Sequence, residues 1–499
     1  MSLIDYDVIV IGAGIGGLTT ASLLAKRGFK VVVLEQSDHP GGYCSSLPQN
    51  GYLFDIGASL FWGFDEGGIF YSLFSELGMI DGMLKGDNIR KTDPGLQIVL
   101  PNHRIDLFSE RSRFFEEIKR EFPRDLIYLK NFYQEIDHIE EKLYEIGETG
   151  HPFVYNGKNR AKINQIKKFF LNIYALVNNN RFLESYLRGW NKGPELERFM
   201  DLQTMYFGQR SAADSPISFL AIISGIQRRG IYYIGGGAQF IADAMERSIR
   251  GSKGEIIYHA RVEEILTRKG GCVFGVRARH KDISIEIFSR TVISNTPTFN
   301  LMRTSISKIR YKRMIKNLQQ GWVPFSILLG VDEKVIPEPM REHVLMMRDY
   351  NLPPYGDNLI FISVNAAWDK TRAPEGKRCI TASILLPSDI MKSSNIKSVL
   401  KEKGKEMIQY LEQVIPFLSD HIECVIDVDP LTYQSFTMRE DGKMGMIKGG
   451  ANMYGFSGLS NISPSRQLFL VGDTTYPGHS AAATVKSGMK TADLITGKM

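Results

Sequence analysis

Apolar residues occur in unbroken runs at both ends of the chain. Residues 7–12 (DVIVIG) and 30–34 (KVVVL) are two such runs, and residues 18–27 (LTTASLLAKR) between them have the composition of a helix. Short runs that are wholly apolar are typical of strands buried on both faces of a parallel sheet. The first 35 residues therefore predict a βαβ unit. Near the other end, residues 468–471 (LFLV) predict a strand, and residues 480–496 predict a final helix.

Two long segments, roughly residues 90–230 and 300–455, interrupt this pattern and are rich in large apolar side chains. In the first of them, apolar residues recur at spacings of three and four, which predicts one face of a helix. These residues are Ile163, Ile166, Phe170, Ile173 and Val177. The face either packs inside the protein or, with the neighbouring lysines, lies in the interface of an anionic bilayer.

Composition excludes several classes of protein. A chain of 499 residues with 43% hydrophobic and 23% charged residues is long enough for two or three folded domains and is not disordered. The four cysteines are far apart and form no C-x-x-C pair, so neither a disulfide framework nor a metal site is expected. The longest uncharged apolar stretch, residues 215–227, is shorter than the roughly 20 residues of a membrane-spanning helix.

The formal net charge of +6 comes from one stretch. Residues 152–200 contain nine basic and three acidic side chains, and they include no recognisable nucleic-acid-binding module. We therefore expect no nucleic-acid partner. We expect instead a cytoplasmic protein whose region 158–200 either packs internally or docks on a membrane surface.

The glycines after the first strand carry the clearest chemical signal. Gly12, Gly14 and Gly17 have the G-x-G-x-x-G spacing, and Glu35 follows the second strand. In such a βαβ unit the glycines allow a tight turn, a close approach of a diphosphate and packing of the helix on the strand. The helix N-terminus offers free N–H groups to the phosphates, and the acid accepts hydrogen bonds from ribose hydroxyls. These residues predict a dinucleotide site.

Further motifs make the resemblance to a family specific. They are Gly41-Gly42, residues 52–59 (YLFDIGAS), residues 232–240 (YYIGGGAQF), residues 292–297 (VISNTP) and Gly472-Asp473. Together they resemble the phytoene desaturase, carotenoid isomerase and retinol saturase group, within the amine-oxidase-like flavoproteins. The resemblance covers both ends and the centre of the chain, and it implies FAD as the cofactor.

The resemblance also implies a fold and a set of binding residues. The fold is an α/β architecture, in which a discontinuous Rossmann-type FAD-binding domain (1–90, 230–300 and 455–499) carries an inserted mixed α+β substrate domain (91–229 and 301–454). Val262 is expected to hold the adenine, Asp473 the ribityl or phosphate part, and the start of the last helix to face the flavin. The full predicted set is Gly12, Gly14, Ile15, Gly16, Gly17, Glu35, Gln36, Gly41, Gly42, Tyr43, Ser59, Val262, Gly472, Asp473, Ser480, Ala481 and Ala482.

Two positions near these motifs need separate comment. The family often has Arg or Lys directly after Gly-Gly, and this chain has Tyr43 there, which weakens a strict desaturase assignment but not FAD. His479 precedes the last helix and is either a proton donor beside the flavin or a residue that caps the loop. Asp441 and Lys443 could also lie near the substrate cavity.

The activity implied by the resemblance is hydride transfer to or from flavin N5 on an apolar polyene or isoprenoid. Desaturation, saturation and cis-trans isomerisation all remain open. Because no second G-x-G-x-x-G motif is present, electrons are expected to be exchanged with quinone, oxygen or a separate reductase. The competing hypotheses are a flavin amine or protoporphyrinogen oxidase and a non-enzymatic protein of the GDP-dissociation-inhibitor type.

Overall fold

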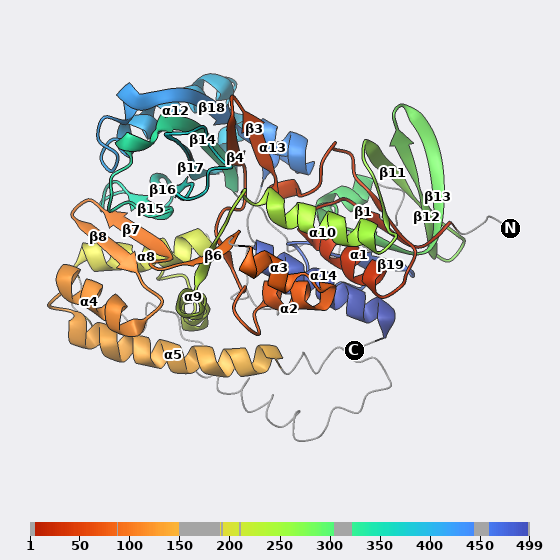
Figure 1. Cartoon of the computed structure of the whole chain (residues 1–499), viewed down its shortest axis with the longest axis horizontal. Helices are drawn as coiled ribbons and strands as arrows, with labels where there is room; N and C mark the ends of the chain where they lie inside the picture. The colour runs from red at the N-terminus through yellow and green to blue at the C-terminus, as the bar shows by residue number, and fades with distance from the viewer. Residues whose placement is uncertain are drawn as a thin grey trace. The chain divides into compact units, whose positions relative to one another are not determined.

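A computed structural model describes residues 5–86, 88–148, 190, 193–208, 211–303, 322–443 and 459–497. The predicted helix at 163–177 and most of the basic region 158–200 lie outside the described residues. The chain divides into two compact units, and Figure 1 labels their helices and strands. Unit 1 comprises residues 1–90, 232–338 and 363–496, and unit 2 comprises residues 91–231, 339–362 and 497–499.

Unit 1 is built on a sheet with the strand order β10-β2-β1-β13-β12-β11, and β19 pairs with β13. Strands β10, β2, β1, β13 and β19 are parallel, whereas β11, β12 and β13 form an antiparallel meander. The bounds are β1 Tyr6–Ile11, β2 Val31–Leu34, β10 Glu255–Ile257, β11 Ala260–Thr267, β12 Val273–His280, β13 Ile283–Ser294 and β19 Leu468–Leu470. The predicted α/β class with a Rossmann-type βαβ unit is confirmed.

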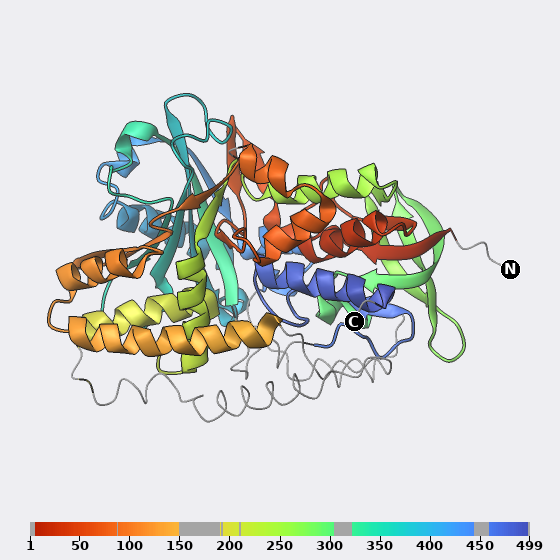
Figure 2. The ribbon, with the colours of Figure 1, turned by 60° about the horizontal axis from the view of Figure 1, so that its bottom comes forward.

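The central strands are buried on both faces, as their unbroken apolar runs predict. Val8 and Val10 of β1 contact one apolar cluster, and Ile9 and Ile11 contact another on the opposite face. Helices α1 (Ile15–Lys26), α10 (Gln239–Gly251) and α14 (Ala481–Thr496) contribute to the first cluster. Helix α1 packs directly against both α10 and α14, and Figure 2 shows α1 and α14 side by side.

A second sheet of unit 1 contains the antiparallel strands β18, β14 and β17. Helices α12 and α13 pack on β14. The bounds are β14 Trp322–Asp332, β17 Lys377–Pro387, β18 Ile422–Val428, α12 Ile396–Leu411 and α13 Pro430–Thr437. Residues 46–85 of unit 1 contain β3 Ser46–Gln49, β4 Tyr52–Asp55, β5 Phe61–Trp62, α2 Ile69–Leu77 and α3 Ile80–Lys85.

The described residues of unit 2 include three strands of a sheet and the helices α4, α5, α8 and α9. Strand β15 is parallel to β7, and β7 is antiparallel to β8. Helix α5 packs against α9 and α4, and α8 packs against α9 and β7. The bounds are β7 Leu96–Leu100, β8 His103–Leu107, α4 Arg111–Glu121, α5 Leu126–Glu148, α8 Pro194–Gly208, α9 Ile217–Arg229 and β15 His343–Met347. Strands β6 (Ile89–Thr92), β9 (Ile231–Ile234) and β16 (Gly356–Val364) run across the unit boundaries.

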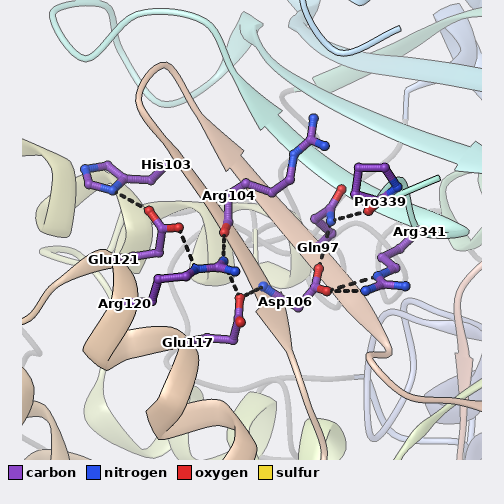
Figure 3. A network of polar contacts seen from close by, with 9 residues as sticks. All are labelled: Gln97, His103, Arg104, Asp106, Glu117, Arg120, Glu121, Pro339 and Arg341. Atoms are coloured by element: carbon purple, nitrogen blue, oxygen red, sulfur yellow. Dashed lines mark hydrogen bonds and ion pairs between the residues drawn. The ribbon is translucent and has the colours of Figure 1, made fainter. Parts of the chain in front are cut away.

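Charged side chains join the sheet of unit 2 to α4 (Figure 3). The carboxylate of Asp106 accepts hydrogen bonds from Gln97 at 2.7 Å and from Arg341 at 2.6 Å. Glu117 accepts from the Asp106 backbone N–H at 3.0 Å, and His103 lies 2.8 Å from Glu121. Because these charges are paired with one another, the network explains how α4 is fixed on β8 without an entirely apolar interface.

The division into units differs from the predicted domain boundaries in one respect. Residues 301–338 and 363–454 belong by compactness to the same unit as the nucleotide-binding elements, although the sequence assigns them to the substrate domain. Compactness and ligand contact are different criteria, so the functional assignment of these residues stays a prediction. Among the described helices, none combines the length and the apolar character of a bilayer-spanning segment.

Candidate functional site

The predicted glycine motif forms a tight turn between β1 and α1. Gly12 has φ +93°, a value that favours glycine, and Gly14 is the N-cap of α1. A Cβ atom on Gly17 would lie 2.3 Å from the Gly12 carbonyl oxygen, so the helix packs where only hydrogen fits. Ile15 and Gly16 form the buried first turn of α1. The free N–H groups of this turn and the positive end of the helix dipole create an anion-binding position.

The second glycine pair lies next to the first motif. The Gly41 N–H donates to the Ala13 carbonyl at 2.9 Å, and Gly41 forms a β-bridge with Gly14. Gly41 and Gly42 have φ values of +123° and +60°, which permits this close approach. Two glycine motifs that are separate in the sequence thus lie next to each other in the structure.

Asn295 lies beneath the glycine loop, and sequence reasoning did not assign it a role. Its side-chain nitrogen donates to the Gly12 carbonyl at 3.4 Å. A Cβ atom would lie 2.6 Å from Asn295 Nδ2 if placed on Gly14 and 2.9 Å from Asn295 Oδ1 if placed on Gly16. Asn295 belongs to the segment 292–297, one of the motifs that resemble the family. Its place directly after β13, a strand parallel to β1, is the feature that could have indicated its role.

Glu35 follows β2 and is held by the backbone. Its two carboxylate oxygens accept hydrogen bonds from the Ala13 N–H at 2.7 Å and the Ser37 N–H at 2.9 Å. Gln36 beside it is half-buried. Val262 lies on β11 and packs at the edge of the apolar cluster that contains β2. These three residues therefore lie along the side of the sheet where the sequence places the adenosine.

The last helix also begins next to the glycine loop. Ser480 caps α14, because its hydroxyl accepts from the Ala483 N–H at 3.1 Å and its carbonyl from the Thr484 N–H at 2.9 Å. Ala481 and Ala482 form the first turn of α14. The methyl group of Thr484 would lie 3.0 Å from a Cβ atom on Gly16. Two helix N-termini therefore converge at one place, which strengthens the local preference for an anion.

Asp473 lies at this convergence and carries a buried ion pair. Arg439 Nη2 donates to both carboxylate oxygens, at 2.7 and 2.8 Å, and His479 Nδ1 lies 3.5 Å away. Burial alone would raise the pKa of Asp473, but Arg439 and His479 hold the pKa well below its ordinary value. Asp473 is therefore ionised at neutral pH.

Arg439 was not among the predicted residues, although it lies close to Asp441 and Lys443 in the sequence. Those two side chains pair with each other at 2.7 Å. Arg439 carried no local signal, because its partner is 34 positions away. Tyr43 and Ser59 of the predicted set lie near each other, because the Tyr43 carbonyl accepts a hydrogen bond from the N–H of Ala58, the residue before Ser59, at 2.8 Å. Gly472 precedes Asp473 and has φ +132°.

The arrangement fits a dinucleotide such as FAD on two structural grounds. First, Gly14, Gly17 and Gly41 pack so closely on Asn295, Gly12 and Cys44 that only glycine fits, and the absence of side chains there leaves backbone that a diphosphate can approach. Second, Nη1 of Arg439 is buried and has no hydrogen-bond partner among the described residues. A buried donor without an acceptor is costly, so a bound acceptor would remove a penalty.

Comparison with known proteins supports this interpretation. Residues 10–77 match the family described as an NAD(P)-binding Rossmann-like domain. The chain is 27% identical to the prolycopene isomerase of Daucus carota (98% of this chain, 79% of the relative). It is 25% identical to the all-trans-retinol 13,14-reductase of Danio rerio (96% and 84%). It is 24% identical to the zeta-carotene-forming phytoene desaturase of Myxococcus xanthus (94% and 90%).

Solved structures share the fold at lower identity. Putrescine oxidase bound to putrescine has a TM-score of 0.64 at 15% identity, with 99% of each chain covered. The RAB GDI of Plasmodium falciparum has a TM-score of 0.56 at 12% identity, with 99% of this chain and 98% of that chain covered. An amine oxidase and a GDP-dissociation inhibitor thus have the same fold, and the fold alone does not separate the competing hypotheses.

Proposed function

Since this chain is homologous over nearly its whole length to prolycopene isomerases, retinol 13,14-reductases and a phytoene desaturase, we propose that it is an FAD-dependent oxidoreductase of an apolar polyene or isoprenoid. The observation that carries the proposal is that the N-termini of α1 and α14 converge where the Gly12-Gly14-Gly17 motif meets the Gly41-Gly42 pair. This arrangement suits the diphosphate of a dinucleotide, and the named relatives supply the substrate class.

Each group of residues has a role in this proposal. The first turns of α1 and α14 bind the diphosphate through backbone N–H groups, and Asn295 keeps the glycine loop in position. Glu35 accepts hydrogen bonds from the adenosine ribose through the lone pairs that its two backbone donors leave free, and Asp473 orients the ribityl part. When bound, the flavin would supply hydride acceptance or donation at N5. Whether that chemistry serves desaturation, saturation or isomerisation is left open by the three relatives.

The absorbance spectrum of the purified protein tests the cofactor. We expect flavin bands that stay with the protein through gel filtration and are released as FAD on denaturation. Gly14→Val should lose these bands, because the added side chain would meet Asn295 and fill the diphosphate position. Gly82→Ala is the matched control, because a Cβ atom there meets nothing within 4 Å. A colourless wild-type protein that does not take up added FAD would contradict the proposal.

The substrate class is tested on the loaded enzyme under anaerobic conditions. Oxidised enzyme mixed with a polyene should lose its flavin absorbance if it desaturates, and reduced enzyme should regain it if it saturates. An isomerase should change the substrate spectrum without net change in the flavin. Aliphatic amines tested in parallel address the amine oxidase hypothesis: bleaching by amines but not by polyenes would favour it.

Membrane docking and the electron partner are further parts of the proposal. A polyene substrate would be dissolved in membrane, and the basic region 158–200 provides the charge that attracts anionic lipid. We expect the protein to float with anionic liposomes at low salt and to be released by high salt. No flotation at low salt would contradict docking while leaving the cofactor assignment intact. Quinone, oxygen and a separate reductase are the electron partners to compare.

A further inference from the structure

Arg439 pairs with Asp473 in an unusual way. An arginine and a carboxylate commonly form two parallel hydrogen bonds that use two guanidinium nitrogens. Here Nη2 alone donates to both oxygens of Asp473. Nη1 is left buried and has no acceptor among the described residues. The side chain of Arg439 is only 8% exposed, so bulk solvent does not reach this donor freely.

The surroundings of Arg439 indicate where this free donor is placed. The guanidinium carbon lies 5.5 Å from the centre of the Tyr43 ring, and Tyr43 directly follows Gly41-Gly42. Gly42 in turn approaches Gly14, since a Cβ atom on Gly42 would lie 3.6 Å from the Gly14 Cα. Arg439 is thus fixed against both chain segments that border the diphosphate position, one through Tyr43 and the other through Asp473.

We propose that Arg439 supplies the positive charge beside the cofactor diphosphate that related flavoproteins place directly after Gly-Gly. This inference rests on the proposed function, because it requires a bound dinucleotide. Tyr43 occupies the position of the family's arginine or lysine, and its ring supports the guanidinium that arrives from residue 439. Nη2 holds Asp473, and Nη1 donates to a phosphate oxygen.

The charge balance at the site is compatible with this role. Arg439 and Asp473 neutralise each other as a pair, and His479 and Tyr43 are further titratable groups that interact with Asp473. The attraction for an anion therefore comes from the directed Nη1 donor together with the N-termini of α1 and α14. Burial alone would lower the pKa of Arg439, but Asp473 and Tyr43 raise it, so the guanidinium stays charged.

The test measures binding of FAD, ADP and riboflavin to the full chain freed of its cofactor. ADP contains the diphosphate without ribityl or flavin, and riboflavin contains ribityl and flavin without phosphate. Arg439→Met should weaken FAD and ADP alike, by about ten- to a hundredfold, and riboflavin by a clearly smaller factor, through the loss of the partner of Asp473 alone. Unchanged ADP affinity would overturn the proposal, because Arg439 would then not contact the diphosphate.

Two further variants keep the test decisive if Arg439→Met folds poorly. Arg439→Lys keeps the ion pair with Asp473 but offers a single nitrogen, so it should still lose about tenfold in ADP affinity. Tyr43→Arg added to Arg439→Met should restore ADP binding, because it returns the charge to the family's position. ADP affinity within threefold of wild type in Arg439→Lys, or no recovery in the double variant, would overturn the proposal.

Arg372→Lys is the matched control, because Arg372 is the buried arginine of another ion pair in unit 1. It should lower stability without changing the ADP affinity of the folded protein. The outcomes also separate the inference from the proposed function. A wild-type protein that binds neither FAD nor ADP would remove both, whereas normal binding by all the Arg439 variants would remove the inference alone.

Discussion

Unit 1 contains two buried aspartate–arginine pairs that use their polar atoms differently. Asp55 accepts from Arg372 at 2.7 Å, and its other oxygen accepts from the Ser46 hydroxyl and the Ala238 N–H, both at 2.9 Å. Arg372 also donates through Nε to the Leu53 carbonyl at 2.9 Å. The pair of Asp473 and Arg439, in contrast, leaves Nη1 without an acceptor.

The difference separates a structural pair from a binding pair. The Asp55 pair joins β4, the loop before α10 and the segment around residue 372, and its partners all come from the chain itself. The Asp473 pair has one donor that the described chain does not satisfy, and the guanidinium that carries it lies against the ring of Tyr43, the residue after Gly41-Gly42. Both pairs are buried and both shift the pKa of a partner, so burial and charge alone would not distinguish them.

The largest expected effect comes from breaking the structural pair. Arg372→Met would leave the buried Asp55 carboxylate without its countercharge, and we expect the free energy of unfolding to fall by about 3–5 kcal/mol. The loss should be the same increment with and without FAD. Urea denaturation of both forms measures it, and a loss confined to the FAD-loaded form would contradict the distinction between the pairs.

A smaller effect is expected from the glycine that touches the same pair. Gly237 has φ +78°, and a Cβ atom there would lie 2.6 Å from Asp55 Oδ1. Gly237→Ala should cost about 1–3 kcal/mol of stability, from backbone strain and from displacement of the carboxylate. Gly82→Ala serves as the control, because it has room for a methyl group and should be neutral or slightly stabilising. Equal thermal midpoints of Gly237→Ala and wild type would contradict this expectation, because the Asp55 carboxylate would then move aside without a loss of stability.

The pH dependence of stability tests the pair of Asp473 and Arg439. In the wild type the pKa of Asp473 is depressed, so its contribution to stability is present above the ordinary aspartate pKa and is lost only as the pH falls below it. In Arg439→Met, burial without the countercharge would raise the pKa of Asp473. The variant would then be most stable while Asp473 is protonated, and it would lose stability as the pH rises through the raised pKa. We expect the stability difference between wild type and variant to grow from about pH 4 towards neutrality. Parallel unfolding curves across this range would contradict the assignment.

The smallest effect is expected at His479. Its side chain is 27% exposed, and Nδ1, which is buried, lies 3.5 Å from Asp473, farther than the two contacts of Arg439 with the same carboxylate. His479→Gln should change the free energy of unfolding by less than about 0.5 kcal/mol. Urea denaturation at neutral pH measures the change. A loss above 2 kcal/mol would mean that His479, rather than Arg439, is the main partner of Asp473.

The sequence predicts the parts of this molecule that depend on neighbours in the chain. The βαβ unit, the glycine turn and the final helix follow from apolar runs and glycine spacing, because local geometry fixes them. Asn295 and Arg439 escaped prediction for a different reason. Their roles arise where segments distant in the sequence meet: Asn295 lies beneath a loop more than 280 positions earlier, and Arg439 pairs across 34 positions. The binding roles of the site residues stay predictions.

Strand β13 has a consequence for how the protein is made. Its pairing with β1 joins Val8 to Thr291, and its pairing with β19 joins Val292 to Leu468. During synthesis the apolar first strand can pair early with β2, but its neighbour on the other side is nearly 300 residues behind it, and the sheet is completed only after residue 470 leaves the ribosome. Such distant pairings are intrinsically slow to form and leave apolar edges exposed meanwhile. The nascent chain should accordingly depend on chaperones until its C-terminal segment is released.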